Sequence, residues 1–220
     1  RERRMGHAAA ELRRGRSLDS VIARNGYESH SGFRTAFERT FGGPPSHVRR
    51  AGAIVTTQIA SPLGLLTAAA VDDGLCLLEF EPRDGRSEAW LTKRFAAAAV
   101  PGSHRWLDQI RAELGDYFSG RRREFTVPVV TPGTPFQEAV WTALRAIPYG
   151  ATCSYADIAR AVGSPNAVRA VGQANGGNRV AIVVPCHRVV NAGGRLGGYG
   201  GGLWRKQFLL DLERSHTARS

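Results

Sequence analysis

The feature that most constrains this chain is the segment 185–189, Pro-Cys-His-Arg-Val, together with the apolar run 182–184 before it. The run is β-branched and predicts a short strand. Pro185 ends that strand because proline has no N–H to donate to a sheet. In a regular strand Cys186 and His187 would point to opposite faces. If the thiol and the imidazole work together, the backbone at this point must therefore be irregular.

Cysteine usage leaves two interpretations of Cys186. A thiol reacts as its thiolate when a base or a positive environment is near, whereas most free cysteines are buried and inert. The three cysteines are odd in number and far apart, which argues against a disulfide framework or a Cys-x-x-Cys metal site and favours a reducing cytosol. Cys76 lies in an apolar run and is predicted to be a core residue. Cys153 is expected to be structural, although its place at a helix start is one where thiol pKa values fall.

Charge is distributed unevenly along the chain, whose formal net charge is +11. Residues 1–50 hold 11 basic and 5 acidic residues, residues 51–130 hold 9 and 10, and residues 131–220 hold 10 and 4. Two basic segments indicate a polyanionic partner, although a basic segment can also be a solvated surface. The chain contains no run of about 18 apolar residues, so no membrane span is predicted. No secretory signal is evident either. The first residue is Arg1, which suggests a piece of a longer protein.

Residues 1–50 predict three helices. The first is basic and amphipathic over 1–16, the second is short with Ser17 as its N-cap, and the third runs from Ser29 to about Thr40. The apolar stripe of the third helix repeats every four residues and consists of Phe33, Phe37 and Phe41. A helix, a short glycine turn and a second helix form the helix-turn-helix pattern.

Residues 51–130 predict a small α/β unit without a catalytic constellation of its own. Strands are expected over 53–60, 63–71, 74–81 and 125–130, and helices over 86–98 and 104–119. The turn at Asp72-Asp73-Gly74 is a strong hairpin signal. The basic triplet 121–123 is expected to be a solvated loop, with phosphate contact as the alternative.

Residues 131–220 contain a second, independent helix-turn-helix pattern. Capping boxes start its first two helices, and they pair Thr134 with Gln137 and Ser154 with Asp157. The glycine-rich stretch 191–202 lacks a phosphate-loop sequence and predicts a flexible wing or a pocket wall. A final helix is expected from Leu203 to about Glu213.

The helix expected over 166–175 has an unusual composition. It carries small residues at Ala167, Ala170 and Gly172, and one arginine, Arg169, projects from it. Helices that read the major groove usually carry several long polar side chains. This helix is better suited to lie close in a narrow groove and insert one long side chain. The alternative for Arg169 is a surface salt bridge.

Two resemblances follow from these segments. The stretch IARNGYESHSGFRTAFERTFGGPPSHVRR resembles the second helix-turn-helix of AraC-type regulators, a family whose DNA-binding unit has two such motifs. A three-helix bundle without DNA contact is the alternative for it. From Thr134 to Glu213 the chain closely resembles the O6-alkylguanine-DNA alkyltransferases, on FQEAVWTALRAIPYGATCSYADIARAVGSPNAVRAVGQANGGN and IVVPCHRVVNAGGRLGGYGGGLWRKQFLLDLE. The middle segment fits the less distinctive N-terminal domain of that family.

The second resemblance implies roles for matching residues. Cys186 would be the acceptor of the alkyl group, and His187, through a water and with Glu213 behind it, would be the base relay. Tyr155 and Lys206 would donate hydrogen bonds to the departing guanine.

Further positions follow from the same resemblance. Asn178 would support the turn beside the thiol, and Arg169 would fill the space left by the flipped nucleotide. The DNA-facing set would be Arg169, Ala167, Ala170, Gly172 and Tyr155. The walls of the base pocket would be Tyr199, Val189, Gly198 and Gly200.

The combined arrangement looks like the Ada-type adaptive-response proteins. It implies a multidomain α/β plus α fold, with a partial AraC-type bundle over 1–50, a ribonuclease H-like α/β domain over 51–130 and a winged helix-turn-helix-like domain over 131–220. The four-cysteine zinc domain of that type does not occur here, so we expect no metal and no phosphotriester repair. No cofactor is expected, because the lesion itself is the alkyl donor.

The expected function is single-use DNA repair by transfer of the alkyl group from O6-alkylguanine, with O4-alkylthymine as a further candidate lesion. The expected partners are damaged duplex DNA and, through residues 17–50, promoter DNA. A monomer in the bacterial cytosol or nucleoid, without membrane contact, is the simplest form. The main alternative is a transcriptional regulator of an alkylation response whose thiol is only a sensor, and a structural α/β protein is the weakest alternative.

Overall fold

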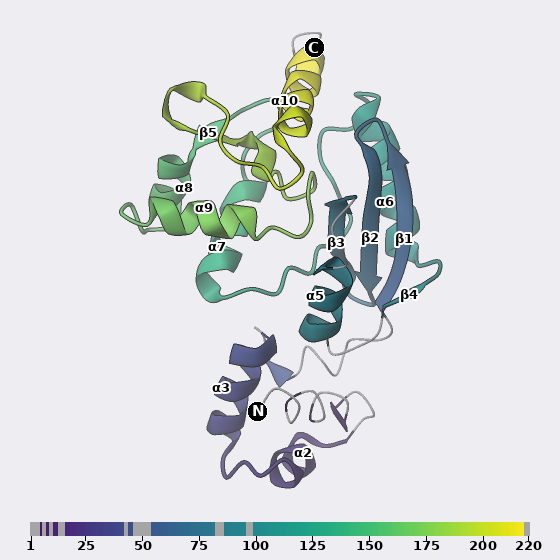
Figure 1. Ribbon diagram of the computed structural model, residues 1–220, viewed down its shortest axis with the longest axis vertical. Helices are drawn as coiled ribbons and strands as arrows, with labels where there is room; N and C mark the ends of the chain where they lie inside the picture. Colours follow the sequence, from purple (N-terminus) through teal and green to yellow (C-terminus); the bar gives the residue numbers. More distant parts are fainter. Residues whose placement is uncertain are drawn as a thin grey trace.

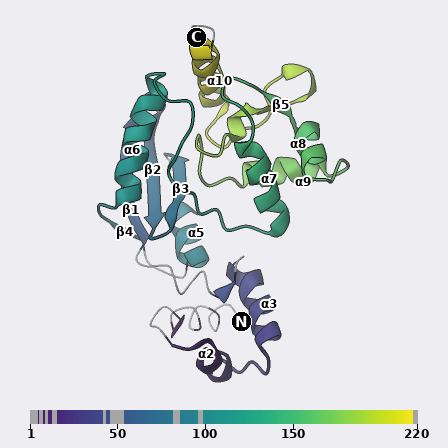
Figure 2. The same ribbon diagram turned by 180° about the vertical axis from the view of Figure 1, so that it is seen from behind.

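The computed structural model describes residues 16–41, 44–45, 54–81, 86–95 and 99–217, with Met5, Ala8, Glu11 and Leu12 near the N-terminus. In this part of the chain two N-terminal helices precede a four-stranded sheet, which in turn precedes a group of helices and short turns. Figures 1 and 2 show from opposite sides that the sheet and the C-terminal helices lie next to each other.

The N-terminal helices are α2 (Leu18–Arg24) and α3 (His30–Phe41), in agreement with the second and third predicted helices. The Ser17 side chain caps α2 by accepting a hydrogen bond from the backbone N–H of Ser20 at 3.3 Å. A small core of their own holds these helices together, and Phe33, Phe37, Val21, Met5 and Leu12 are among its buried members. Most of the predicted helix over 1–16 lies outside the described residues.

The middle of the chain forms a sheet of strand order β3-β2-β1-β4. β1 (Ile54–Ser61), β2 (Gly64–Val71) and β3 (Gly74–Phe80) form two antiparallel hairpins. The three strands and the second hairpin agree with the prediction. β4 (Ala99–Pro101) pairs in parallel with the start of β1. The sequence did not predict β4, because three residues are too few to show a periodic pattern.

Helices cover both faces of this sheet. α5 (Arg86–Phe95) and α6 (Arg105–Phe118) agree with the two predicted helices, though α5 is described as a helix only to Phe95. Leu91 of α5 shares a core with Cys76, whereas Leu114 of α6 belongs to the main core on the other face. All of β3 is therefore buried, and Cys76 is a core residue, as its apolar neighbours predict.

The predicted strand over 125–130 is wrong. Only an isolated bridge forms there, between Val129 and Leu75 of β3. The Leu75 N–H donates to the Pro128 carbonyl, and the Val130 N–H donates to the Leu75 carbonyl, both at 2.8 Å. Pro128 has no N–H, so the ladder does not extend through it.

A later segment covers the rest of the β3 edge and joins the sheet to the C-terminal helices. The Leu78 N–H donates to the Arg179 carbonyl, and the Ala181 N–H donates to the Leu78 carbonyl, both at 2.8 Å. An ion pair reinforces the junction, because Arg179 Nη1 lies 3.0 Å from the Oε1 of buried Glu79. The backbone just before residues 182–189 is thus anchored on the sheet.

The C-terminal helices are α7 (Pro135–Arg145), α8 (Tyr155–Ala161), α9 (Val168–Gly176) and α10 (Leu203–Thr217). The short elements between them are β5 (Cys153–Ser154), the 3₁₀ turn η1 (Cys186–Arg188), β6 (Val189–Val190) and the 3₁₀ turn η2 (Ala192–Gly194). Both predicted capping boxes are present, at the starts of α7 and α8. Among the described helices, none combines the length and the apolar character that a membrane span requires.

Candidate active site

The backbone before Cys186 is a pair of tight turns, so the predicted strand over 182–184 is wrong. The Val183 N–H donates to the Ala181 carbonyl across Ile182, whose φ is +71°, and the Cys186 N–H donates to the Val184 carbonyl across Pro185. Both bonds span three residues, which defines γ-turns. A positive φ at a β-branched residue is strained. The irregular backbone that a joint action of thiol and imidazole requires is therefore present.

Asn178 holds these turns in place. Its Nδ2 donates to the Val184 carbonyl at 2.8 Å and to the Cys186 Sγ at 3.1 Å, while its Oδ1 accepts from the Val180 N–H at 2.9 Å. The side chain is buried. One amide therefore ties the strained backbone to the thiol.

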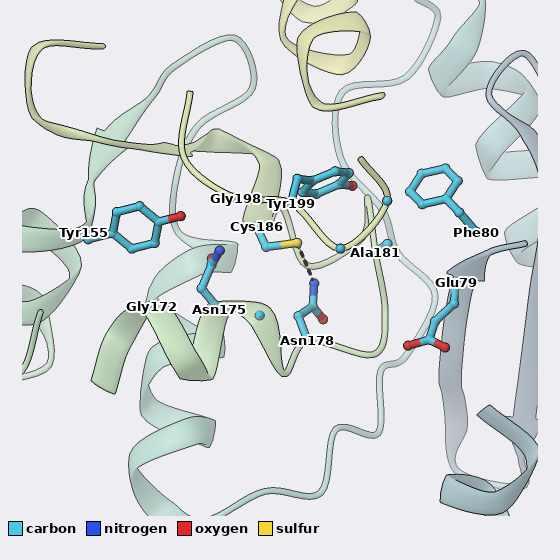
Figure 3. A pocket seen from close by; sticks show the side chains of 13 residues that line it. Glu79, Phe80, Tyr155, Gly172, Asn175, Asn178, Ala181, Cys186, Gly198 and Tyr199 are labelled. Atoms are coloured by element: carbon cyan, nitrogen blue, oxygen red, sulfur yellow. Dashed lines mark hydrogen bonds between the residues drawn. The ribbon is translucent and has the colours of Figure 1, made fainter. Parts of the chain in front are cut away.

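The Cys186 thiol faces a pocket of about 290 Å³ (Figure 3). The pocket is lined by Glu79, Phe80, Tyr155, Gly172, Asn175, Gly176, Asn178, Ala181, Cys186, Gly198, Tyr199, Gly200 and Gly201. Its wall opposite α9 is the glycine-rich stretch, and it packs tightly, because a Cβ at Gly197 would lie 2.8 Å from the Tyr155 hydroxyl. The glycine-rich stretch is thus a pocket wall, one of the two predicted alternatives.

Several expected pocket residues meet here. Tyr155, at the start of α8, and Tyr199 lie on either side of the thiol in Figure 3. Burial and the charge of nearby Cys186 raise the pKa of the Tyr155 hydroxyl, which therefore remains a hydrogen-bond donor at neutral pH. Val189 is absent from the lining; it is fully buried in β6.

Lys206 is fully buried and is absent from the pocket lining. Its Nζ donates to the Val189 carbonyl at 2.6 Å and to the Gly197 carbonyl at 3.4 Å. Burial lowers the pKa of Lys206, and the charge of Cys186 opposes that shift. The ammonium group thus binds two carbonyls that shape the turn and the glycine-rich wall.

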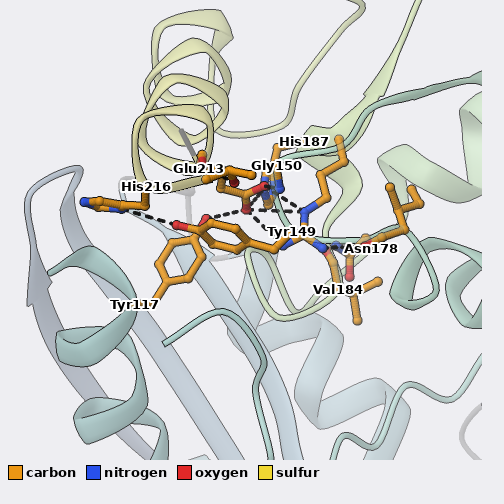
Figure 4. Close-up of polar contacts among 11 residues, drawn as sticks. Tyr117, Tyr149, Gly150, Asn178, Val184, His187, Glu213 and His216 are labelled. Atoms are coloured by element: carbon orange, nitrogen blue, oxygen red, sulfur yellow. Dashed lines mark hydrogen bonds and ion pairs between the residues drawn. The ribbon is translucent and has the colours of Figure 1, made fainter. Parts of the chain in front are cut away.

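The next two residues of η1 do not line the pocket and belong to a buried polar network instead. Figure 4 shows His187 beside Glu213 in this network. The Nε2 of His187 lies 2.9 Å from the Oε1 of Glu213 on α10, and both side chains are fully buried. The Arg188 guanidinium donates to both oxygens of the same carboxylate, through Nε to Oε2 at 3.0 Å and Nη2 to Oε1 at 2.9 Å. The histidine and the glutamate, 26 residues apart, are thus brought together.

Two further groups donate hydrogen bonds to the Glu213 carboxylate. The Tyr117 hydroxyl of α6 donates to Oε1 at 2.7 Å, and the Gly150 N–H donates to Oε2 at 3.0 Å. Tyr117 belongs to the sheet unit, so the network crosses the junction between the two units. Burial raises the pKa of Tyr117 well above 10, and Glu213 adds to that shift; the phenol therefore stays a donor.

Electrostatics fix the protonation of the pair. Burial by itself would raise the pKa of Glu213, but the hydrogen bonds and charges of His187 and Arg188 outweigh it and lower the pKa to about 2. Complete burial lowers the pKa of His187, although the hydrogen bond to Glu213 and the charge of Glu213 oppose this shift. At neutral pH the site therefore holds a carboxylate and a neutral imidazole. The Nδ1 of His187 is buried and has no hydrogen-bond partner among the described protein atoms.

The helix α9 forms one edge of the pocket and exposes the residues expected to face DNA. Arg169 and Ala170 are exposed, and Ala167 and Gly172 are partly exposed. Arg169 makes no hydrogen bond or ion pair with any residue that the structure describes, so the salt-bridge alternative finds no support.

The other cysteines lie away from this chemistry. Cys153 is half-buried in β5, which pairs with β6 just beyond η1. Burial and the charge of Asp157 raise the pKa of Cys153, which opposes activation by the helix start. Cys186 is therefore the thiol that opens onto the pocket. Within the described residues, no group of three His, Cys, Asp or Glu side chains gathers to hold a metal ion.

Sequence reasoning missed three residues of the site. Arg188 belongs to the motif itself, but nothing in its neighbours places its guanidinium on Glu213. Tyr117 lies on the apolar stripe of its helix and is read there as a core residue. Asn175 lies one turn along α9 from the small residues, and helical spacing from Gly172 was the signal that could have placed it at the pocket.

Family models match three consecutive parts of the chain. Residues 1–51 match a helix-turn-helix domain, residues 54–131 match the ribonuclease-like domain of 6-O-methylguanine DNA methyltransferase, and residues 135–215 match the DNA binding domain of the same family. The fold is thus a mixed α/β arrangement of an N-terminal helix-turn-helix, a ribonuclease-like domain and a C-terminal DNA-binding domain.

Individual proteins give the same result. A methylated-DNA–protein-cysteine methyltransferase of Mycolicibacterium paratuberculosis is 48% identical over 74% of this chain and 93% of its own length. The inducible enzyme of that name from Bacillus subtilis is 50% identical over 57% of this chain and 70% of its own. A crystal structure of Mycobacterium tuberculosis OGT in complex with DNA aligns with a TM-score of 0.65 and 42% identity, over 74% of this chain and 94% of that one.

Proposed function

The chain belongs to the methylated-DNA–protein-cysteine methyltransferases, which repair DNA by direct alkyl transfer, and we propose that Cys186 is the acceptor of the alkyl group from O6-alkylguanine. One observation carries this assignment. Of the three cysteines, Cys186 alone lines the pocket, while Cys76 is in the core and Cys153 lies outside the lining.

The proposed step is a displacement at the alkyl carbon. The Cys186 thiolate attacks this carbon, an S–C bond forms, and the C–O6 bond breaks with its electron pair left on the base. The guanine anion takes up a proton, so the thiol proton is in effect transferred to guanine. A thioether has no good leaving group, so each protein molecule acts once. O4-alkylthymine is a second candidate donor for the same displacement.

The thiol proton leaves through His187 in this proposal. The imidazole is neutral, and Glu213 accepts from its Nε2 side, which directs Nδ1 toward proton uptake. A water between Nδ1 and the thiol completes the relay. The carboxylate stabilises the imidazolium that forms, which is the role of the third member of a nucleophile–base–acid set.

Tyr155 and Lys206 assist the leaving base in different ways. The Tyr155 hydroxyl lies in the pocket as a protonated donor and stabilises the negative charge that develops on guanine. Lys206 holds the carbonyls of Val189 and Gly197. We therefore propose that Lys206 and Val189 act on the base through the backbone that they fix, and that the positive charge of Lys206 near Cys186 adds to this effect.

DNA contact is proposed for the exposed face of α9. A lesion inside a duplex reaches the thiol only if its nucleotide is flipped out, at a cost of a few kcal/mol. Exposed Arg169 is free to enter the duplex and fill the space, while Ala167, Ala170 and Gly172 allow close approach. Tyr199, Gly198 and Gly200 would then enclose the flipped base.

The assignment is tested by mass. The protein is incubated with duplex DNA containing one O6-methylguanine, and its intact mass and modified peptide are measured, with Cys186→Ala as control. We expect a gain of one CH₂ group on Cys186 and none in the variant. Methylation of Cys153 or Cys76, or an unchanged mass, would contradict the proposal.

A regulatory function is favoured by the helix-turn-helix match over residues 1–51. We propose that residues 17–50 bind promoter DNA through the exposed arginines of α3. Replacing Arg34 and Arg39, both exposed, by alanine should weaken binding to promoter fragments at fixed salt while the rate of methyl transfer stays unchanged. Equal binding by both proteins would leave only the repair function.

Finer features of the organisation complete the proposal. The three units divide near residues 50 and 130, the middle one being ribonuclease H-like and the last winged helix-turn-helix-like. The protein acts as a monomer on duplex DNA. Its three cysteines form no disulfide with one another, which suits the reducing bacterial cytosol.

A further inference from the structure

One arginine beside the pocket takes no part in the proposed transfer. Arg205, near the start of α10, is partly buried. Its guanidinium donates to three carbonyls, from Nη1 to Gly201 at 2.8 Å, from Nε to Leu63 at 2.9 Å and from Nη2 to Glu81 at 3.4 Å. Gly201 lines the pocket, whereas Leu63 lies between β1 and β2 and Glu81 directly follows β3. Arg205 therefore joins the pocket wall to the sheet.

Two aromatic rings hold this guanidinium in place. The Cζ of Arg205 lies 4.8 Å from the centroid of the Phe80 ring and 4.7 Å from that of the Trp204 ring, and such contacts suit the planar group of arginine. Phe80 also lines the pocket, and its ring meets Tyr199 edge-on with the centroids 6.2 Å apart. Figure 3 shows Tyr199 beside the thiol and Phe80 beyond it. The wall thus packs on a ring that Arg205 contacts.

The composition of the wall explains why it needs such an anchor. Residues 197–202 include five glycines, and glycine loses more conformational freedom on ordering than any other residue. The Lys206 ammonium binds the Gly197 carbonyl at one end, and Arg205 binds the Gly201 carbonyl near the other. Tyr199 lies between these two points. Two neighbouring cations of α10 therefore fasten the wall on both sides of the ring that faces the thiol.

We propose that Arg205 is a positioning residue, which fastens the glycine-rich wall to the sheet and thereby sets the width of the pocket beside Cys186. This inference rests on the proposed function, since it assumes that the flipped base is enclosed by this wall. A fixed wall holds a small O6-alkyl group in the geometry that displacement requires, whereas a loosened wall gives room to a larger group. Through this anchor the sheet unit takes part in selecting the lesion.

The test compares a small and a large O6-alkyl group. Single-turnover transfer is measured from duplexes that carry O6-methylguanine or O6-benzylguanine in the same sequence. The unchanged protein is compared with Arg205→Met, which keeps an aliphatic side chain and removes the donors. In the variant the ratio of benzyl to methyl transfer should rise about tenfold, because a small group that is misplaced loses its attack geometry. Hydrogen–deuterium exchange of the backbone amides over 197–202 should become faster as well.

The ratio of the two rates within one protein is the informative quantity, because a folding defect slows both reactions equally. Arg123→Met is the matched control. Arg123 also reaches from the sheet unit to α10, where its Nη2 donates to the His216 carbonyl at 3.2 Å, but it does not line the pocket. Its removal should leave the ratio and the exchange of the wall unchanged.

Three outcomes would overturn the proposal. In the first, Arg205→Met keeps the ratio of the unchanged protein. In the second, the wall of Arg205→Met exchanges no faster than before. In the third, Arg123→Met produces the same changes as Arg205→Met, which would assign the effect to a general weakening of the junction. Absence of transfer from O6-methylguanine to Cys186 in the unchanged protein would instead refute the proposed function.

Discussion

The two sides of the short turn η1 are built in opposite ways. On one side Cys186 faces an open pocket, which Tyr155 and Asn175 also line. On the other side His187 and Arg188 enter a network in which the Glu213 carboxylate accepts from four different residues and is fully buried. The pocket side is open to a ligand, whereas on the buried side the carboxylate has its donors without one, and the Nδ1 of His187 is left without a partner among the described residues.

This difference indicates how one turn can be both reactive and stable. A nucleophile needs access to its substrate, so the Cys186 side chain lines an open pocket. The base that activates it needs a fixed tautomer and the exclusion of bulk water, and a buried carboxylate with several donors supplies both. Substitutions on the buried side should therefore change stability and rate together, whereas those on the pocket side should change rate or selectivity alone.

The largest effect is expected for Glu213→Gln. The change leaves Arg188 without its counter-charge inside the protein, which should lower the free energy of unfolding by about 3 kcal/mol. Loss of the base relay should slow methyl transfer by about 100-fold. Chemical denaturation and single-turnover rates measure the two effects. Asp211→Asn, an exposed change on the same helix, should alter stability by less than about 0.5 kcal/mol.

The same carboxylate predicts a pH dependence. Its pKa is lowered from 4.5 to about 2 in the folded protein, so its stabilisation is present above pH 4.5 and is lost as the pH falls toward 2. The unfolding free energy of Glu213→Gln should fall less steeply over this range than that of the unchanged protein. If the unfolding free energies of the two proteins fell equally steeply with pH, the Glu213 charge would not stabilise the buried side.

An intermediate effect is expected for Arg169→Ala on the DNA-facing edge of the pocket side. Because Arg169 is exposed and unpaired within the described chain, stability should not change. Transfer from O6-methylguanine in duplex DNA should slow by about tenfold, since flipping costs a few kcal/mol, while reaction with free O6-benzylguanine should be unaffected. Arg145→Ala on α7 provides a matched charge removal, because Arg145 is also exposed and has no ion pair with the residues that the structure describes. Equal losses on both substrates would place Arg169 in the chemistry instead of in DNA opening.

The smallest effect is expected for Tyr117→Phe, which removes one donor from the buried side. The free energy of unfolding should fall by about 1 kcal/mol, and the transfer rate should fall a few-fold as Glu213 is held less firmly. Tyr149→Phe is the control, because its hydroxyl contacts His216 at 3.3 Å and not Glu213. If Tyr149→Phe lowered the free energy of unfolding and the transfer rate as much as Tyr117→Phe does, the hydrogen bond to Glu213 would not be the cause of the effect.

Much of the local structure was predictable because it depends on neighbours in the sequence. The capping boxes at Thr134 and Ser154 join residues three apart, and the Asp72-Asp73-Gly74 turn sets the hairpin between β2 and β3. The strands predicted over 125–130 and 182–184 failed for different reasons, although their β-branched residues fit a strand. The first segment meets β3 at Val129 alone, and the second is bent by the γ-turns at Ile182 and Pro185.

By itself the sequence determined the identities of the thiol, the imidazole and the exposed arginine, and their order around a proline and a set of glycines. Tertiary structure alone decided which surfaces they share. His187 and Glu213 are 26 residues apart and Tyr117 is 96 residues from Glu213, so no local pattern can join them. Contacts of that kind form only when packing brings distant helices together, and burial then makes every unpaired polar atom costly. That cost is the physical reason why the protein supplies hydrogen-bond donors on the buried side of η1, while the pocket side is left open for DNA.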